Sequence, residues 1–200
     1  MHKTSYKKMS WFKNNYLDTN KKLKILDIGS LDINNNNFNY KQIFNNDNWE
    51  YDGLDFEKGA NVDILVSNIY HWDVIKDSSY DVIISGQFFE HLNYFWVVME
   101  EINRVLKPGG YCCIIAPSSG PKHGKLNDCY RFNEAGMKSL AEYVDFEVIH
   151  TSTNSSDENP WHDSCIIAKK SNYPDSANEI KEKMVNAESE INNVLNMINK

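Results

Sequence analysis

The sequence predicts an α/β fold in which a doubly wound, seven-stranded, mostly parallel sheet carries helices on both faces. Its 200 residues, 41% of them hydrophobic and 24% charged, suit one globular domain with modest additions. Short, nearly continuous apolar runs bounded by turn residues alternate along the chain with longer stretches of helical period. Strands that are apolar on both faces and separated by helices are typical of a parallel sheet that is covered on both sides.

Seven apolar runs supply the expected strands. In chain order they are Lys24–Ile28, Tyr51–Leu54, Val62–Val66, Asp81–Ser85, Gly110–Ala116, Phe146–Thr151 and Ser164–Lys169.

Helical spacing of apolar residues predicts several connections around these strands. The stretch Asn93–Leu106 is amphipathic, and the turn at Pro108 ends it. A shorter helix, Glu134–Tyr143, leads into the sixth strand. An apolar stripe within residues 6–17 predicts an N-terminal helix, and a weak helix is expected around Tyr40–Phe44.

The chain changes character after Pro174. Apolar residues from Ala177 to Ile198 follow alternating steps of three and four residues, which predicts a C-terminal helix. This helix either packs on the domain or forms the coiled-coil seam of a homodimer, and both alternatives stay open because the repeat is short. We therefore expect a sheet domain with its N-terminal helix over residues 1–172 and a helical extension over residues 173–200.

The composition disfavours several classes of partner. A formal net charge of −7 argues against nucleic acid, whose phosphates normally require a basic patch. No apolar stretch approaches the ~20 residues of a membrane span, and the basic N-terminus lacks the apolar segment of a secretory signal. The four cysteines have no CxxC spacing, which favours buried thiols in the reducing cytoplasm.

A glycine turn directly after the first strand marks a candidate ligand site. The strand runs through Asp27 into Gly29, where the missing Cβ lets a ligand approach the backbone closely. Ligands of open parallel sheets bind outside the carboxyl ends of the strands, and this turn stands at such an end. Asp55 ends the second strand 28 residues after Asp27, so its carboxylate can accept both hydroxyls of a ribose that lies across the strand ends.

These segments belong to an ordered set of motifs. The set consists of ILDIGS, YDGLDFEKGANVDILVSN, SSYDVIISGQFFEHL and EINRVLKPGGYCCIIAPSSG, over about residues 22–170. In order and spacing it resembles the class I S-adenosylmethionine-dependent methyltransferases, in particular their type 11 branch. The resemblance implies a Rossmann-like methyltransferase fold with an antiparallel last strand, and S-adenosyl-L-methionine as the cofactor.

The resemblance also implies cofactor roles by position. Asp27 and Gly29 would border the methionine part of the cofactor, with Ser30 nearby. Asp55 would hold the ribose, and Phe56 would lie against the adenine.

Further cofactor contacts are implied after the third and fourth strands. Asn68 and Ile69 would meet the adenine edge, and Ser85 and Gln87 would line the floor near the methionine. The chain departs from the family's fuller GxGxG turn, because only Gly29 is present. We interpret this as an altered loop at a retained site.

The acceptor site is expected beside the fourth and fifth strands. Methyl transfer from a sulfonium is an in-line displacement, which a protein assists by aligning the reactants and removing a proton from a hydroxyl acceptor. Histidine is the residue type most often used as a base near neutral pH, so His91, in FFEHL, is one candidate base. The alternative is a residue at a helix start that is bonded to nearby backbone.

A second candidate cluster follows the fifth strand. The segment from Ser118 onward resembles the PSSGPxHxxxxDCxRF stretch of methyltransferases encoded with bacterial surface-polysaccharide genes. His123 would act as base or substrate ligand, with Asp128 orienting it or the acceptor. Arg131 could clamp an anionic group, and Tyr130 and Ser118 would contact the substrate. Alternatively, the Asp128–Arg131 pair only braces the loop.

A third cluster lies before the last strand. Trp161 and His162 could form a platform for a sugar, or they could simply pack the loop. His123 and Asp128, together with His162 and Asp163, are potential ligands of a divalent metal. They lack a tight spacing motif, so no metal site is predicted.

The sequence therefore predicts an enzyme that methylates a small acceptor bearing a hydroxyl or amine group. The resemblance points to a sugar or a nucleotide-linked glycan precursor. A non-catalytic scaffold that dimerises through Ala177–Ile198 is one alternative. A nicotinamide oxidoreductase is disfavoured, because the turn after Gly29 lacks the GxGxxG pattern that binds a dinucleotide pyrophosphate.

Overall fold

The computed structural model describes residues 3–33, 38–123, 127–154, 160–172 and 197. Its elements are α1 (Lys3–Tyr16), β1 (Leu23–Ile28), the 3-10 turn η1 (Tyr40–Gln42), β2 (Trp49–Asp55), β3 (Ile64–Leu65), β4 (Tyr80–Gly86), the 3-10 turn η2 (Phe89–His91), α2 (Phe95–Val105), β5 (Leu106–Pro117), α3 (Glu134–Tyr143), β6 (Glu147–Thr153) and β7 (Asp163–Lys169). Two compact units divide the chain, Met1–Lys170 and Ser171–Lys200. Almost all of the second unit lies outside the described residues, and so does nearly all of the predicted helix from Ala177 to Ile198.

The seven strands form one sheet in the order β3-β2-β1-β4-β5-β7-β6. β1 pairs in parallel with β2 and β4, β2 with β3, and β4 with β5. β7 runs antiparallel to both of its neighbours, β5 and β6. The predicted fold, including the antiparallel last strand, is confirmed.

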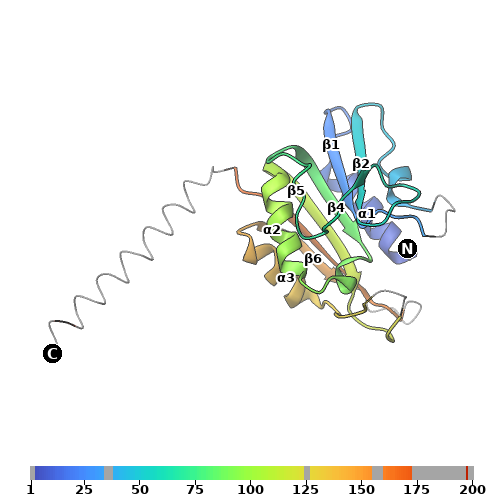
Figure 1. The fold of residues 1–200 in the computed structure, drawn as a ribbon, viewed down its shortest axis with the longest axis vertical. Helices are drawn as coiled ribbons and strands as arrows, with labels where there is room; N and C mark the ends of the chain where they lie inside the picture. Colours follow the sequence, from blue (N-terminus) through green and yellow to red (C-terminus); the bar gives the residue numbers. More distant parts are fainter. Residues whose placement is uncertain (1–2, 34–37, 124–126, 155–159, 173–196, 198–200) are drawn as a thin grey trace. The chain divides into compact units, whose positions relative to one another are not determined.

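Helices cover the two faces of this sheet (Figure 1). Alternate residues of the central strands enter different hydrophobic clusters, because successive side chains of a strand point to opposite faces. Leu26 and Ile28 of β1 join the cluster that contains α2 and α3 residues, whereas Ile25 joins the cluster that contains Met9 and Phe12 of α1. This two-sided core makes the sheet rigid and leaves its strand ends as the place for a site.

The structure shortens some predicted elements. The third strand has two residues rather than the predicted Val62–Val66. Just before it, the side chain of Asp63 takes up a backbone bond of β2, because its carboxylate accepts the N–H of Gly53 at 2.9 Å. α2 begins at Phe95 rather than Asn93, whose backbone N–H donates to the Tyr70 hydroxyl at 3.0 Å.

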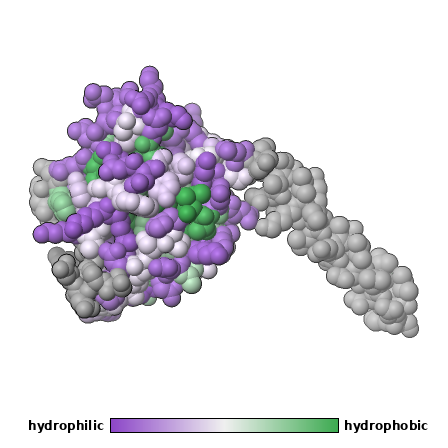
Figure 2. All heavy atoms as spheres, turned by 180° about the vertical axis from the view of Figure 1, so that it is seen from behind, coloured by the Kyte–Doolittle hydropathy of each residue, from purple (hydrophilic) through white to green (hydrophobic). Residues whose placement is uncertain are grey.

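The described surface is mainly hydrophilic on the face that Figure 2 shows, and its hydrophobic side chains form only small, separate patches. In the part of the chain that the structure describes, each helix is too short or too polar to cross a lipid bilayer.

Candidate cofactor and acceptor site

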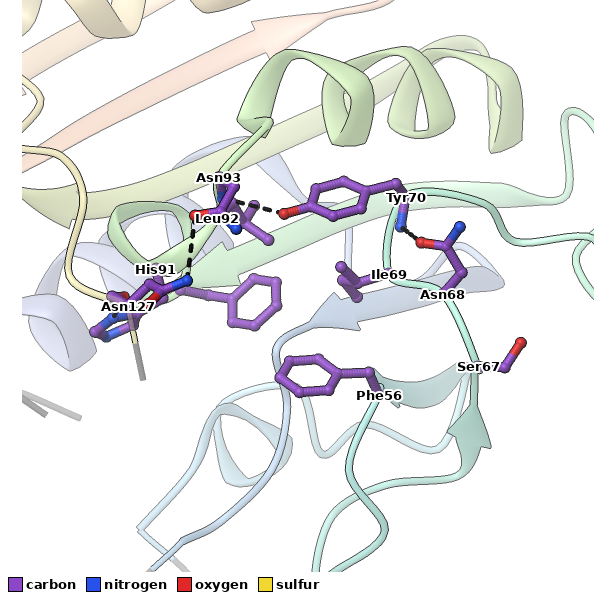
Figure 3. A pocket seen from close by; sticks show the side chains of 10 residues that line it. Phe56, Ser67, Asn68, Ile69, Tyr70, His91, Leu92, Asn93 and Asn127 are labelled. Carbon is purple, nitrogen blue, oxygen red and sulfur yellow. Dashed lines mark hydrogen bonds between the residues drawn. The ribbon is translucent and has the colours of Figure 1, made fainter. Parts of the chain in front are cut away.

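A cavity of about 350 Å³ opens at the carboxyl edge of the sheet. Its lining residues all follow the ends of β2, β3, β4 or β5, as expected for ligand sites of open α/β sheets. They are Phe56, Ser67, Asn68, Ile69, Tyr70, Phe88, His91, Leu92, Asn93 and Asn127. In Figure 3, His91 and Asn127 lie at one end of the cavity and Ser67 lies at the other.

Two aromatic rings give this cavity an apolar interior suited to a flat base. The ring centroids of Phe56 and Phe88 are 6.4 Å apart, and the buried side chain of Ile69 lies beside them. Asn68 accepts the backbone N–H of Tyr70 at 3.0 Å, which fixes the turn at the polar edge of the cavity. Three residues predicted to meet the adenine, Phe56, Asn68 and Ile69, therefore line one cavity.

Asp55 stands where β1 and β2 end side by side. Its Oδ1 accepts the backbone N–H groups of Phe56 and Glu57 at 2.8 and 3.0 Å, and its Oδ2 accepts that of Leu31 at 3.1 Å. Burial raises the pKa of Asp55, and these three donors oppose the rise. A carboxylate offers about four acceptor positions, so Oδ2 keeps one for a hydroxyl. Binding both ribose hydroxyls would require one of these backbone bonds to open.

Gly29 is required by its backbone conformation and by a neighbouring ring. Its φ is +74°, in the left-handed region that glycine adopts without strain. A Cβ placed on Gly29 would lie 2.2 Å from Cγ of Phe88, so the ring fills the space that glycine leaves. The glycine thus positions Phe88 at the cavity as well as opening the turn.

We expect Gly29→Ala to lower the free energy of unfolding by about 2–3 kcal/mol, because the new methyl group meets both a strained φ and a packed ring. Displacing Phe88 should also weaken binding of S-adenosylhomocysteine. Urea denaturation and calorimetric titration measure the two effects. Gly136→Ala in α3 is the control, since the new Cβ would lie 3.5 Å from Oδ1 of Asn133, an ordinary van der Waals distance. Unchanged stability of Gly29→Ala would contradict the packing argument.

Asp27 is a buried carboxyl group near the end of β1. It is 3% exposed and accepts a hydrogen bond from the hydroxyl of Tyr51 at 2.5 Å. Burial raises the pKa of Asp27 to about 7, although the Tyr51 bond acts in the opposite direction. Asp27 therefore lies two residues before Gly29 and is hydrogen-bonded to Tyr51 of the neighbouring strand β2.

Between about pH 4 and 7 the folded chain holds a proton on Asp27 that the unfolded chain has released, so stability falls as pH rises through this range. Asp27→Asn should reduce this slope by up to ~1.4 kcal/mol per pH unit. Tyr51→Phe, which removes the donor that lowers the pKa, should extend the slope to higher pH. Denaturation at a series of pH values measures both. A slope that Asp27→Asn leaves unchanged would show that another group carries it.

Ser30 and Ser85 use their hydroxyl groups within the protein. Ser30 Oγ donates to the carbonyl oxygen of Asn61 at 2.8 Å, and Ser85 Oγ donates to that of Ile28 at 2.9 Å. Neither serine lines the described cavity. In the structure Ser30 connects the loops after β1 and β2, and Ser85 connects β4 to β1. Their cofactor roles stay predictions.

Gln87 lies at a strained turn after β4, with a φ of 60°. Its Nε2 donates to Oδ1 of Asp163 at 3.1 Å, and the other oxygen of that fully buried carboxylate accepts the hydroxyl of Thr4 in α1. Gln87 therefore lies outside the cavity lining and links the turn to β7 and α1. Its Oε1 is buried without a hydrogen-bond partner among the described residues.

The histidines of two predicted clusters come together beside the cavity. The rings of His91 and His123 are 5.4 Å apart, and His91 Nε2 lies 3.7 Å from Oε1 of Glu90. His91 Nδ1 lies 2.7 Å from the carbonyl oxygen of Asn127, a contact that favours a proton on Nδ1. The ring of His91 therefore contacts the backbone of the loop after β5, and it also reaches the cavity.

Asp128 is held from two sides. Arg131 binds it through both carboxylate oxygens, at 2.6 and 2.8 Å, and this pair holds the pKa of Asp128 well below its usual range. Oδ2 of Asp128 also accepts the backbone N–H of His123 at 2.8 Å and lies 3.3 Å from its ring Nδ1. Burial lowers the pKa of His123, and Asp128 opposes that shift. The pair both braces the loop and faces the His123 ring.

The remaining predicted substrate residues surround this loop. Trp161 packs on His123 with ring centroids 4.4 Å apart, and Arg131 lies 5.9 Å from the Trp161 ring. The Ser118 hydroxyl donates to the carbonyl oxygen of His162 at 2.7 Å. Trp161 therefore reaches the histidine cluster, whereas Ser118 and His162 close the loop behind it.

Tyr130 lies apart from the histidines. Its hydroxyl donates to the carbonyl oxygen of Asn93 at 3.1 Å, and its ring meets Phe95 at 4.9 Å. This side chain joins the loop after β5 to the start of α2.

Sequence reasoning did not assign roles to Glu90, Tyr70, Asn93 or Asn127. Glu90 is fully buried, and neither carboxylate oxygen has a hydrogen-bond partner in the described parts of the chain. Its place in FFEHL, directly before His91, was the available signal. The other three residues lie in irregular loops whose contacts depend on tertiary structure.

Comparison with known families finds one domain match. Residues 24–114 match the family model described as a methyltransferase domain. No curated protein sequence is similar enough to match the chain.

Solved structures share the fold. A Burkholderia thailandensis 1,6-didemethyltoxoflavin-N1-methyltransferase, solved with that compound and S-adenosylhomocysteine, is 13% identical with a TM-score of 0.65, covering 84% of this chain and 78% of its own. A protein described as a putative sarcosine dimethylglycine methyltransferase from Galdieria sulphuraria is 17% identical with a TM-score of 0.61, at coverages of 83% and 86%. The [4+2]-cyclase SpnF is 14% identical with a TM-score of 0.60, at coverages of 83% and 80%.

Such low identities show the fold alone. The methyltransferase-domain match over residues 24–114 supports the predicted class of enzyme, and with it the predicted cofactor. The site residues and the acceptor are not settled by either comparison.

Proposed function

Because the chain carries the domain of an S-adenosylmethionine-dependent methyltransferase, we propose that it methylates a small acceptor with a hydroxyl or amine group beside His91 and His123. A sugar or nucleotide-linked glycan precursor is the acceptor class we favour, and this part rests on the resemblance of the loop that contains His123 and Arg131. The homodimer and the cytoplasmic location stay predictions.

The observation that carries the proposal is a continuous site. The apolar cavity lined by Phe56 and Ile69 suits an adenine, and His91 at its end belongs both to the cavity and to the histidine cluster. Its volume of about 350 Å³ lies within the usual range of small-molecule sites. Cofactor and acceptor would therefore meet close to His91.

Different residues would bind the cofactor and the acceptor. Phe56 would pack on the adenine, and Oδ2 of Asp55 would accept a ribose hydroxyl. When bound, S-adenosylmethionine supplies a methyl group that leaves its sulfur as the new bond to the acceptor forms. His123 would contact the acceptor, either taking its proton or serving as a ligand, and Asp128 holds the backbone that carries this ring. Arg131 keeps Asp128 ionised.

Two measurements test the function. Calorimetric titration of the full chain should show binding of S-adenosylmethionine and S-adenosylhomocysteine. A screen of sugars, nucleotide sugars and small amines with a labelled methyl donor should then transfer label to a hydroxyl or amine compound. Cofactor binding without transfer to any of these compounds would favour the non-catalytic alternative, and NAD binding without sulfonium binding would favour an oxidoreductase.

A further inference from the structure

Glu90 has a buried carboxyl group that the described residues leave without a hydrogen bond. Its side chain is 0% exposed, and both carboxylate oxygens lack hydrogen-bond donors among the described residues. Burying a carboxylate without a partner is costly unless it is neutralised or binds a cation. Nε2 of His91 lies 3.7 Å from Oε1 of this carboxyl group.

Two histidines complete a three-ligand set around this carboxylate. One ring nitrogen each from His91 and His123 and one oxygen of Glu90 lie within 4.8 Å of one another. Ligand atoms of one transition-metal ion stand roughly 3–3.5 Å apart, given bonds of about 2.1 Å. Small side-chain rotations would bring the three atoms to those separations.

Nδ1 of His91 has the kind of partner that a metal-bound histidine has, whereas Nδ1 of His123 faces a carboxylate without a hydrogen bond to it. A ligating histidine usually directs its other ring nitrogen to a carbonyl or carboxylate, which fixes the ring and its tautomer. Nδ1 of His91 contacts the carbonyl oxygen of Asn127 at 2.7 Å, and Nδ1 of His123 lies 3.3 Å from Asp128. Trp161 packs against the His123 ring and limits its rotation.

We propose that Glu90, His91 and His123 bind a divalent first-row transition-metal ion, such as Mn²⁺, Co²⁺ or Zn²⁺, with an open coordination position toward the acceptor side. Two imidazoles and one carboxylate suit these ions, and catalytic zinc sites use the same three ligands. The side chains of His91 and His123 are 14% and 29% exposed, so a bound ion would not be sealed off. Of the potential ligands considered from the sequence, only His123 belongs to this set, and the carboxylate of Asp163 is bonded to Gln87 and Thr4 instead.

The site goes beyond the proposed function, because an ion at this position would hold an acceptor hydroxyl and ease the loss of its proton to solvent. His123 would then act as a ligand rather than as the base. Metal binding is measured without cofactor or acceptor, so its failure and a failure of methyl transfer are separate results.

The test uses the full chain without a histidine tag, stripped of metal with a chelator. Calorimetric titration with Mn²⁺, Co²⁺ and Zn²⁺, each alone, should show one ion per chain for at least one of them, and Co²⁺ should give visible absorption bands if it binds through imidazole. Glu90→Gln and His123→Ala should each weaken binding by more than about a hundredfold, and Asp128→Asn by about 10- to 100-fold. His150→Ala should bind as the wild type does, because His150, in β6, packs on Trp11 of α1 and is not part of the cluster.

Circular dichroism of each variant separates ligand loss from unfolding, and thermal shifts on adding metal provide a second measure of binding. The proposal is overturned if the wild type binds none of the three ions at one per chain. It is equally overturned if folded Glu90→Gln and His123→Ala retain wild-type affinity.

Discussion

Asp55→Ala should weaken binding of S-adenosylhomocysteine about a hundredfold. A hydrogen bond to a charged group contributes about 1.5–3 kcal/mol, and the proposed ribose contact would be lost with the carboxylate. The same change removes the acceptor that ties Leu31 of the first loop to the end of β2. Calorimetric titration of wild type and variant gives both dissociation constants.

Two companion variants make this result interpretable. Asp55→Asn keeps an oxygen that can accept the backbone N–H of Phe56, so it should stay folded and show an intermediate loss. Asp52→Asn, on the same strand but bonded to Tyr80 and Lys24, should bind normally. Wild-type affinity in Asp55→Ala would remove the ribose assignment and the cofactor site built on it.

His123→Ala should lower the rate of methyl transfer by about 10²- to 10⁴-fold, the usual contribution of a group that handles the acceptor proton. Affinity for S-adenosylhomocysteine should stay nearly unchanged, because the ring lies outside the cofactor cavity. The rate is measured with the acceptor that takes up the methyl label in the screen.

The metal dependence of that rate separates the two roles of His123. If the ring is the base, chelator leaves the wild-type rate unchanged. If it is a ligand, chelator reduces the wild-type rate to that of His123→Ala, and added metal restores only the wild type. His150→Ala is again the matched control, and a His123→Ala variant as fast as the wild type would exclude both roles.

Strand positions were predictable because their signal is local. Leu23–Ile28 is apolar on both faces, and the turn at Gly29 ends it whatever lies elsewhere in the chain. β3 was predicted too long because a local pattern does not record contacts between segments. One such contact is the bond from the backbone N–H of Gly53 to the carboxylate of Asp63.

Site composition was predictable only in part. Phe56 and Ile69 followed from their places after strand ends, and both line the cavity. The meeting of His91 with His123 depends on how the loops after β4 and β5 fold toward each other. Glu90 is a candidate ligand because its carboxyl oxygens are buried without hydrogen bonds. Burial depends on the tertiary structure, so the sequence around Glu90 does not reveal it.

Hydrogen bonds connect Thr4 to Asp163 and Asp163 to Gln87. Through them, the first turn of α1 supports the turn after β4. Thr4 stands 83 positions before Gln87 in the chain, yet one carboxylate separates their side chains. A protein shortened through Thr4 would keep every strand but leave Asp163 with one donor fewer inside the core. If trimming the amino terminus lowers activity, the expected cause is a shift of Asp163 and Gln87 and not the loss of a contact with substrate.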